Sequence, residues 1–319
     1  GRALVLTATD RDGQMWDARD PYNPVPLGVL INQNQAPIDG AAFSPDSHLV
    51  ATIGRHHDVA LWDITDPRTP EFLSHLDVPD AVGAVFTLDA DILVTGDNQG
   101  HAILWDVSAP RKPSRLDELR ENFRNVNGVA VAPRGHVLAT GDSRRNVRLW
   151  NVDNPRNPEQ TAHHRDHTEA ANEVAFSPDG HWLASTGDDW TVRLWHLTDT
   201  AEPTILLGRH GSPVLHVGFS PNGKFLITVS DDHTARIWDV SNPYEPESYA
   251  ILTEPGLANA VFALDNQTVL TNGTHAIHQW PTDVDTVARQ ICATAGAPIT
   301  HEEWTQYVGD DDYRPPCAP

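Results

Sequence analysis

Tryptophan recurs along this chain of 319 residues at a nearly constant spacing, which limits the folds available to it. Seven of the ten tryptophans follow one another at intervals of 46, 43, 45, 45, 43 and 42 residues: Trp16, Trp62, Trp105, Trp150, Trp195, Trp238 and Trp280. An apolar residue stands nineteen positions before five of them, at Phe43, Phe86, Val131, Phe176 and Phe219. Such a period is typical of repeat folds, in which one unit buries its faces only against its neighbours.

Each repeat has room for four short strands. In the fifth repeat, apolar or alternating segments at 172–176, 182–186, 192–197 and 204–207 are separated by turn residues such as those of FSPDG. Prolines recur five and eight positions after most of the repeated tryptophans, where they predict stiff connectors between strands. Four strands per repeat is the pattern of one propeller blade. We therefore predict an all-β fold, a seven-bladed β-propeller of four-stranded blades.

The strings FSPDG at 176–180 and DDWTVRLW at 188–195, with LWD in other repeats, resemble the WD-repeat β-propeller family over residues 1–282. The proline connectors and the ending ICATAG, PIT, EEW and YRPPC further resemble the C-terminal propellers of large actinobacterial proteins. In those proteins the propeller often follows a signalling NTPase, a helix-turn-helix or a protease-like domain. This resemblance implies a role within a larger bacterial regulatory protein.

The repeat pattern also predicts that two strands are missing. The first repeat lacks the segment that forms the innermost strand elsewhere, and the seventh has no clear outermost strand after Pro281. Seven four-stranded blades need about 28 strands, and the chain supplies about 26. We therefore expect a fragment of a longer polypeptide, whose missing N-terminal segment or upstream domain is one of its partners.

In the WD-repeat family, a His, a Ser or Thr, an Asp and the repeated Trp form a buried hydrogen-bond chain. The resemblance assigns such a structural network to two repeats: His167, Ser185, Asp189 and Trp195 in the fifth, and His210, Thr228, Asp232 and Trp238 in the sixth. Thr186 and Ser230 remain alternatives for the hydroxyl position. The other repeats depart from this pattern, with Gln99 and Arg144 among the residues at the Asp position, and we expect them to have lost the network.

The serine, histidine and aspartate of the fifth repeat also fit an acyl-transfer triad. We favour the structural role, because these positions serve the fold and no G-x-S-x-G elbow is present. We therefore predict no catalytic residues and no enzyme activity. An enzyme with its site at the mouth of the central channel, and a scaffold within an oligomer, remain the alternative functions.

The Asp position of each repeat lies on the loop face, the end of the ring formed by the turns between the second and third strands and the loops before the innermost strands. WD-repeat proteins usually bind partners there. Our candidate binding residues on this face are Arg55, His56, Arg120, Arg124, Arg144, Arg145 and Trp190. Clustered arginines bind carboxylates or phosphates bidentately, and an exposed tryptophan is a typical interface anchor. A solvated patch of arginines and a tryptophan packed on the next blade are the alternatives.

The net charge of −22 argues against nucleic acid and anionic membranes as partners, because both repel an acidic surface. No apolar run approaches the ~20 residues of a membrane helix.

Neither a GxxxxGK[ST] nor a GxGxxG loop is present, so we predict no nucleotide cofactor. The histidine clusters supply no three ligands at a recognisable spacing, so we predict no metal.

The sequence changes character after Trp280. Apolar residues at helical spacing in 283–294, and a capping box at 300–303, predict a short helical C-terminal extension over 283–319 that packs on the ring. It carries both cysteines, Cys292 and Cys317, for which a disulfide and two buried thiols remain alternatives.

The absence of a signal-peptide pattern and the low cysteine content favour the cytoplasm. We therefore predict a non-catalytic, cytoplasmic platform or sensor domain that binds protein partners through its loop face.

Overall fold

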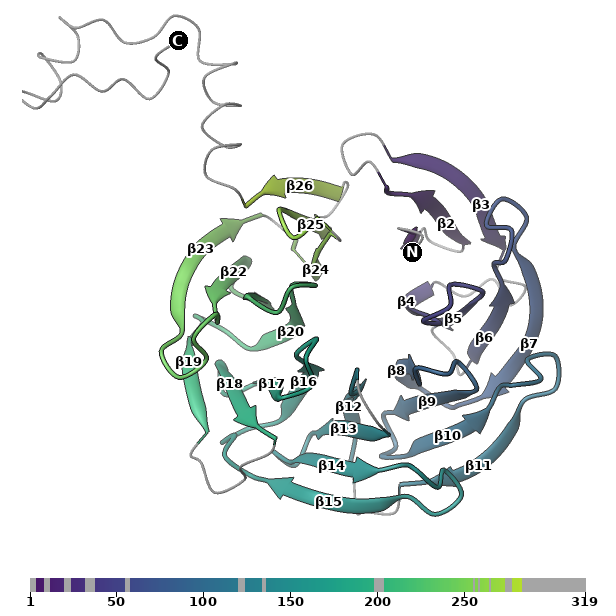
Figure 1. Ribbon diagram of the computed structural model, residues 1–319, viewed down its shortest axis with the longest axis horizontal. Coiled ribbons are helices and arrows are strands. Elements are labelled where there is room, and N and C mark those ends of the chain that lie inside the picture. The colour runs from purple at the N-terminus through teal and green to yellow at the C-terminus, as the bar shows by residue number, and fades with distance from the viewer. Residues whose placement is uncertain are drawn as a thin grey trace, which may run out of the picture.

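The computed structural model describes residues 4–8, 12–19, 24–31, 38–54, 58–119, 124–133, 136–197, 204–254, 256–257, 259–263, 265–272 and 277–282. These residues form seven antiparallel sheets, each a meander of consecutive strands, and contain no α-helix. The sheets stand around a common centre as the blades of a propeller (Figure 1). The predicted all-β propeller is thereby confirmed, whereas the predicted helical extension at 283–319 and both cysteines lie outside the described residues.

We number the blades in chain order, and within each blade the strands run from the innermost to the outermost. Blade 1 comprises β1 (Leu4–Ala8), β2 (Asp12–Asp17) and β3 (Val25–Ile31). Blade 2 comprises β4 (Ile38–Phe43), β5 (Leu49–Gly54), β6 (Asp58–Asp63) and β7 (Glu71–Asp77). Blade 3 comprises β8 (Ala81–Phe86), β9 (Ile92–Asp97), β10 (Ala102–Asp106) and β11 (Ser114–Glu118). Blade 4 comprises β12 (Val126–Val131), β13 (Val137–Asp142), β14 (Val147–Asn151) and β15 (Glu159–His164).

Blade 5 comprises β16 (Ala171–Phe176), β17 (Trp182–Gly187), β18 (Thr191–His196) and β19 (Ile205–Arg209). Blade 6 comprises β20 (Val214–Phe219), β21 (Phe225–Ser230), β22 (Thr234–Asp239) and β23 (Glu247–Thr253). Blade 7 comprises β24 (Asn259–Phe262), β25 (Thr268–Asn272) and β26 (Ile277–Pro281). Among the described residues, blades 1 and 7 therefore have three strands each and the other five blades have four.

Six of the seven repeated tryptophans, from Trp62 to Trp280, lie in the third strand of their blades, and the indole N–H of each donates to a hydroxyl of the second strand. Nε1 of Trp62, Trp105, Trp150, Trp195, Trp238 and Trp280 donates to Thr52, Thr95, Thr140, Ser185, Thr228 and Thr271, respectively, over 2.8–3.1 Å. The hydroxyl precedes the tryptophan by ten residues in the first five pairs and by nine in the last. A tryptophan can therefore be buried without leaving its one polar group unpaired.

The hydrophobic core is divided among the interfaces between consecutive blades. Six clusters each combine residues of two neighbouring blades, from blades 1 and 2 to blades 6 and 7. Because side chains of a strand alternate between its two faces, the second strand of a blade serves both interfaces. Val50 of β5 packs toward blade 1, for example, and the next residue, Ala51, packs toward blade 3. The second strands are accordingly buried along almost their whole length.

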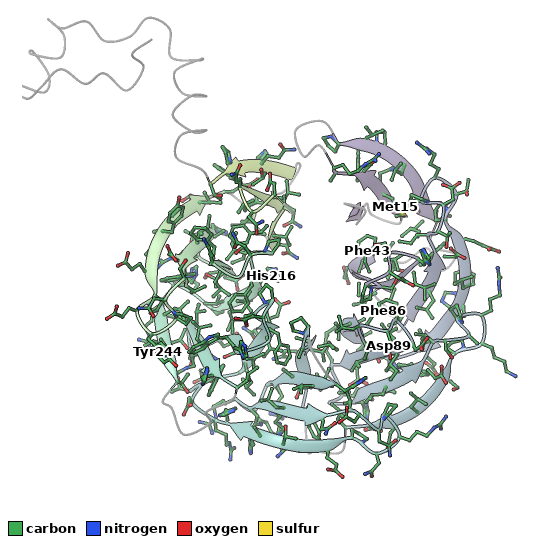
Figure 2. All side chains as sticks on the ribbon, in the orientation of Figure 1. Met15, Phe43, Phe86, Asp89, His216 and Tyr244 are labelled. Carbon is green, nitrogen blue, oxygen red and sulfur yellow. The ribbon has the colours of Figure 1, made fainter. Side chains whose placement is uncertain are left out.

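Polar side chains join neighbouring blades at their inner edges. Asn127 Nδ2 donates to the Ala171 carbonyl over 3.0 Å, and Asn172 Nδ2 donates to the Val214 carbonyl over 3.1 Å. His216 of β20, near the centre of the ring in Figure 2, pairs with a carboxylate of β16, that of Glu173. The interfaces are therefore polar at their inner edges and apolar farther out.

The proline connectors pack against the outer part of the preceding blade. The Gly28 N–H of β3 donates to the carbonyl of Pro67, in the connector of blade 2, over 2.8 Å. Tyr244, at the outer rim in Figure 2, lies in the connector of blade 6 and contacts Trp182 of blade 5, with ring centroids 5.3 Å apart. The connectors thus hold neighbouring blades together on the face opposite the loop face.

Gly128 lies where the innermost strand of blade 4 closely approaches the innermost strand of blade 5. A Cβ atom at this position would lie 2.7 Å from the Asn172 carbonyl oxygen and 2.7 Å from the Glu173 Cα, both backbone atoms of the next blade. We expect Gly128→Ala to lower the free energy of unfolding by roughly 1–3 kcal/mol through overpacking. Gly83→Ala, at the matching position of β8, is the control, because its Cβ would make an ordinary 3.4 Å contact with the Val129 side chain. Equal denaturation midpoints for the two variants would contradict the close approach.

Candidate binding interface on the loop face

Four side chains of blade 5 form a continuous hydrogen-bond chain beneath the loop face. Trp195 Nε1 donates to Ser185 Oγ over 2.8 Å, and this oxygen lies 2.8 Å from His167 Nε2. His167 Nδ1 lies 3.1 Å from both oxygens of Asp189, which also accepts the Thr168 N–H. The chain ties the third strand, the second strand, the entering loop and the tight turn together, which makes the loop face of this blade rigid.

Blade 6 repeats this arrangement. Trp238 Nε1 donates to Thr228 Oγ1 over 3.0 Å, Thr228 Oγ1 lies 2.9 Å from His210 Nε2, and His210 Nδ1 lies 3.2 Å from Asp232. Burial lowers the pKa of His210 to about 4, although the Asp232 carboxylate opposes this shift. Burial would raise the pKa of Asp232, but hydrogen bonds from the side chain of Thr234 and the N–H of Gly211 outweigh it and lower the pKa to about 2. At neutral pH the pair is therefore a neutral imidazole and a carboxylate.

The burial of Ser185 argues against the alternative role of this set in acyl transfer. Ser185 is fully buried, and its hydroxyl already accepts the Trp195 indole N–H. A nucleophile must reach a substrate carbonyl, and this oxygen faces protein on every side. The arrangement supports the fold.

Blades 3 and 4 contain a different network that the sequence pattern did not indicate. Asp97 accepts the N–H of Gln99 over 2.9 Å and pairs with the His101 ring over 2.8 Å. Asp142 accepts both the backbone N–H and the side-chain amide of Asn146, and it forms a buried ion pair with Arg148. Both carboxylates are buried, so these blades hold their turns with other residues.

The position of these aspartates explains why Gln99 and Arg144 stand where the WD-repeat pattern expects an aspartate. Asp97 and Asp142 stand eight residues before their tryptophans, whereas Asp189 stands six before Trp195. Blade 5 has Gly187 at the earlier position, and a Cβ built there would lie 2.8 Å from His167 Nδ1. A side chain at that position therefore points to the place that the His and Asp fill in blade 5. Asp97 and Asp142 therefore reach the corresponding site from a position two residues earlier in the repeat.

Blade 7 uses a glutamate in place of the histidine. Glu254 is buried; its Oε2 accepts the Thr271 hydroxyl over 2.7 Å and its Oε1 lies 2.6 Å from His278 Nδ1. Thr271 in turn accepts the Trp280 indole N–H. In blades 5 and 6 the histidine stands nine residues before the phenylalanine that ends the innermost strand, and this spacing would select Thr253 in blade 7. Glu254 stands eight residues before Phe262, because the loop into blade 7 is one residue shorter.

The tips of the tight turns on the loop face have a left-handed backbone. The residue five positions before the tryptophan has φ of 95° at Gly100, 73° at Arg145, 68° at Trp190 and 64° at His233. Glycine is the residue that adopts such a backbone without steric cost. Blades 4, 5 and 6 instead have an arginine, a tryptophan and a histidine there, all with exposed side chains.

The structure brings some of the predicted binding residues together. The Ser143 N–H donates to the Asn125 carbonyl over 3.1 Å, which places Arg124 beside the turn that carries Arg144 and Arg145. All three arginines are exposed, and the side chain of Trp190, at the matching tip of blade 5, is 45% exposed. Arg55, His56 and Arg120 lie outside the described residues, and their role stays a prediction.

Among the described residues, no group of three His, Cys, Asp or Glu side chains could hold a metal ion. The same part of the chain has no helix long and apolar enough to cross a bilayer.

The comparison with family models identifies the repeat. The model of the WD domain, G-beta repeat, matches three times, over residues 114–151, 158–196 and 202–239. Each match begins at the outermost strand of one blade and ends on the third strand of the next, so the sequence repeat straddles two sheets. Together with the seven antiparallel sheets, the matched WD40 repeats fit a WD-repeat β-propeller. WD40 repeats generally mediate protein–protein interaction or scaffolding, and WD-repeat propellers are typically not enzymes. No curated protein matches the chain.

The lowered pKa of His210 predicts a pH dependence of stability in this propeller. The unfolded chain protonates this histidine near pH 6.5, whereas the folded chain does so only near pH 4. Its stabilising contribution is therefore complete above pH 6.5 and is lost as the pH falls toward 4, by up to roughly 3 kcal/mol. Urea unfolding of the wild type and His210→Gln at several pH values measures this. The stability difference between them should shrink over this range, and a constant difference would contradict the assignment.

The buried ion pair of blade 4 predicts a second effect on stability. Asp142→Ala leaves the Arg148 guanidinium buried without its carboxylate, and we expect a loss of about 3–5 kcal/mol. The double variant Asp142→Ala/Arg148→Met should recover much of this loss, because it buries no charge. Denaturation midpoints measure both effects. If the double variant is as unstable as the single one, the ion pair is not the cause.

Proposed function

We propose that the loop face of blades 4 to 6 is a protein-binding platform without catalytic activity. The observation that supports this best is the choice of residues at the turn tips. Arg145, Trp190 and His233 adopt a left-handed backbone that costs a residue other than glycine about 1–2 kcal/mol. Strain of this kind is typical of sites where the side chain itself is needed.

The turns at the opposite face supply an internal comparison. The described left-handed positions between the first and second strands are Ser47, Ala90, Gly180, Gly223 and Asn266. All of these residues are small, although the backbone conformation is the same. Large side chains at left-handed positions are thus confined, among these two sets of turns, to the loop face of three consecutive blades. Arginine and tryptophan are the residues most enriched at the energetic centre of protein interfaces.

The rigid networks beneath the turns support the same function. Asp142, Asp189 and Asp232 each accept backbone N–H groups of their own turn or of the entering loop. The exposed side chains above them therefore start from fixed backbone positions, which lowers the entropy lost on binding. On the resemblance to actinobacterial propellers, we further propose that the platform acts in the cytoplasm as part of a larger bacterial regulatory protein.

Glycine substitution separates binding from stability in this proposal. Trp190→Gly removes the side chain and relieves the strain, so we expect the free energy of unfolding to rise by roughly 0.5–1 kcal/mol while partner binding is lost. Ser47→Gly relieves the same strain on the opposite face and should keep binding. Affinity capture from extracts of the cells that make the protein, with quantitative mass spectrometry, compares the wild type and both variants. Identical captured sets for all three would contradict a platform on this face.

A further inference from the structure

Three exposed arginines on the loop face of blade 4 indicate the chemistry of the partner, an inference that rests on the proposed function. The chain carries a net charge of −22, and Arg111, Arg115 and Arg148 all form ion pairs with acidic residues. Arg124, Arg144 and Arg145 are exposed and pair with no carboxylate among the described residues. In so acidic a chain, adjacent arginines without a carboxylate leave a local positive charge for a ligand.

The acid nearest to Arg144 and Arg145 in the sequence, Asp142, cannot neutralise their charge. Its Oδ1 accepts the N–H of Arg144 over 2.8 Å, the N–H of Asn146 over 3.1 Å and the Asn146 amide over 2.8 Å. Its other oxygen binds the Asn146 amide and the buried guanidinium of Arg148. The carboxylate is therefore buried and saturated. It holds the turn that presents Arg144 and Arg145 without screening their side chains.

Trp190 places an apolar surface at the same tip of the neighbouring blade. Its N–H donates to the Gly187 carbonyl over 3.1 Å, and its own carbonyl accepts the His210 N–H over 3.0 Å. The backbone is therefore anchored on both sides while the indole ring is 45% exposed. A ligand that lies across the two blades would contact guanidinium groups on blade 4 and an aromatic ring on blade 5.

Acidic side chains limit the size of this positive patch. Five acidic residues are exposed on the loop face: Asp77 at the end of β7, Asp80 in the loop into blade 3, and Asp166, Glu169 and Asp188 of blade 5. An extended polyanion such as nucleic acid would be repelled beyond blade 4. A short anionic segment followed by an apolar side chain fits the patch.

We propose that the loop face of blades 4 and 5 binds a short acidic segment of a partner protein. Its aspartate or glutamate carboxylates pair with Arg124, Arg144 and Arg145, and an adjacent apolar side chain packs on Trp190. Guanidinium groups bind carboxylates through paired hydrogen bonds, which gives geometric selectivity as well as charge attraction. The segment therefore lies with its acidic side chains over blade 4 and its apolar side chain over blade 5.

Fluorescence anisotropy with labelled synthetic peptides tests this proposal on the whole chain. The probe is a short peptide of aspartate and glutamate with one central leucine; a second peptide has the corresponding amides, and a third has alanine instead of leucine. We expect the acidic peptide to bind, the amide peptide not to bind, and the alanine peptide to bind more weakly. Affinity for the acidic peptide should fall as salt rises.

Charge reversal locates the site. Arg144→Glu should weaken binding of the acidic peptide by at least about tenfold, and Arg144→Gln by a smaller factor. Arg156→Glu is the matched control, because it makes the same change of charge at an exposed arginine on the opposite face of the same blade, and it should bind like the wild type. Equal weakening by Arg144→Glu and Arg156→Glu would overturn the site, since only net charge would then matter.

A fourth peptide, with phosphoserine in place of the acidic residues, distinguishes the other anion that arginine pairs bind. Binding of the phosphoserine peptide without binding of the acidic one would overturn the proposal in favour of a phosphorylated partner. If neither binds while partner capture still depends on Trp190, the acidic segment is wrong and the platform of the proposed function stands.

Discussion

The hydrogen bond from the indole N–H to a hydroxyl of the second strand is the interaction on which this propeller depends. It joins the third strand to the second in six blades, and in each of these the tryptophan ring packs against the preceding blade. A ring this large can fill an interface between blades only if its polar atom is satisfied inside the blade. The pairing therefore serves strand register and blade packing together, and its recurrence gives the chain its period.

Apart from this shared hydrogen bond, the blades differ in the side chains that fix the turns of the loop face. Blades 5 and 6 continue from the hydroxyl to a histidine and an aspartate, and blade 7 continues to Glu254. Blades 3 and 4 place a buried aspartate at the end of the second strand instead. All of these solutions put a carboxylate beneath the loop face, and in blades 3 to 6 it accepts backbone N–H groups of the turns or entering loops. Because the buried carboxylates fix the backbone of the turns, the exposed tips can have large side chains, which are Arg145, Trp190 and His233.

Much of the fold was predictable because its information is local and repeated. The tryptophan spacing, the turn strings and the proline connectors each recur, and they predicted blades whose strands the structure contains. The networks of blades 3, 4 and 7 were not predictable in the same way. Asp97, Asp142 and Glu254 occupy the site of the missing partner from other positions in the chain, and a search by fixed spacing cannot recognise a side chain that reaches the same place from a different residue.

The sequence by itself determined the repeat, the number of blades and the residue types available on the loop face, because hydrophobic period and turn chemistry depend on neighbours along the chain. Only the tertiary structure decided which charges remain available. Asp142 and Arg148 neutralise each other inside blade 4, whereas Arg124, Arg144 and Arg145 stay exposed above them. The physical reason is that pairing and burial depend on distances between strands and loops, and a sequence pattern contains no such distances.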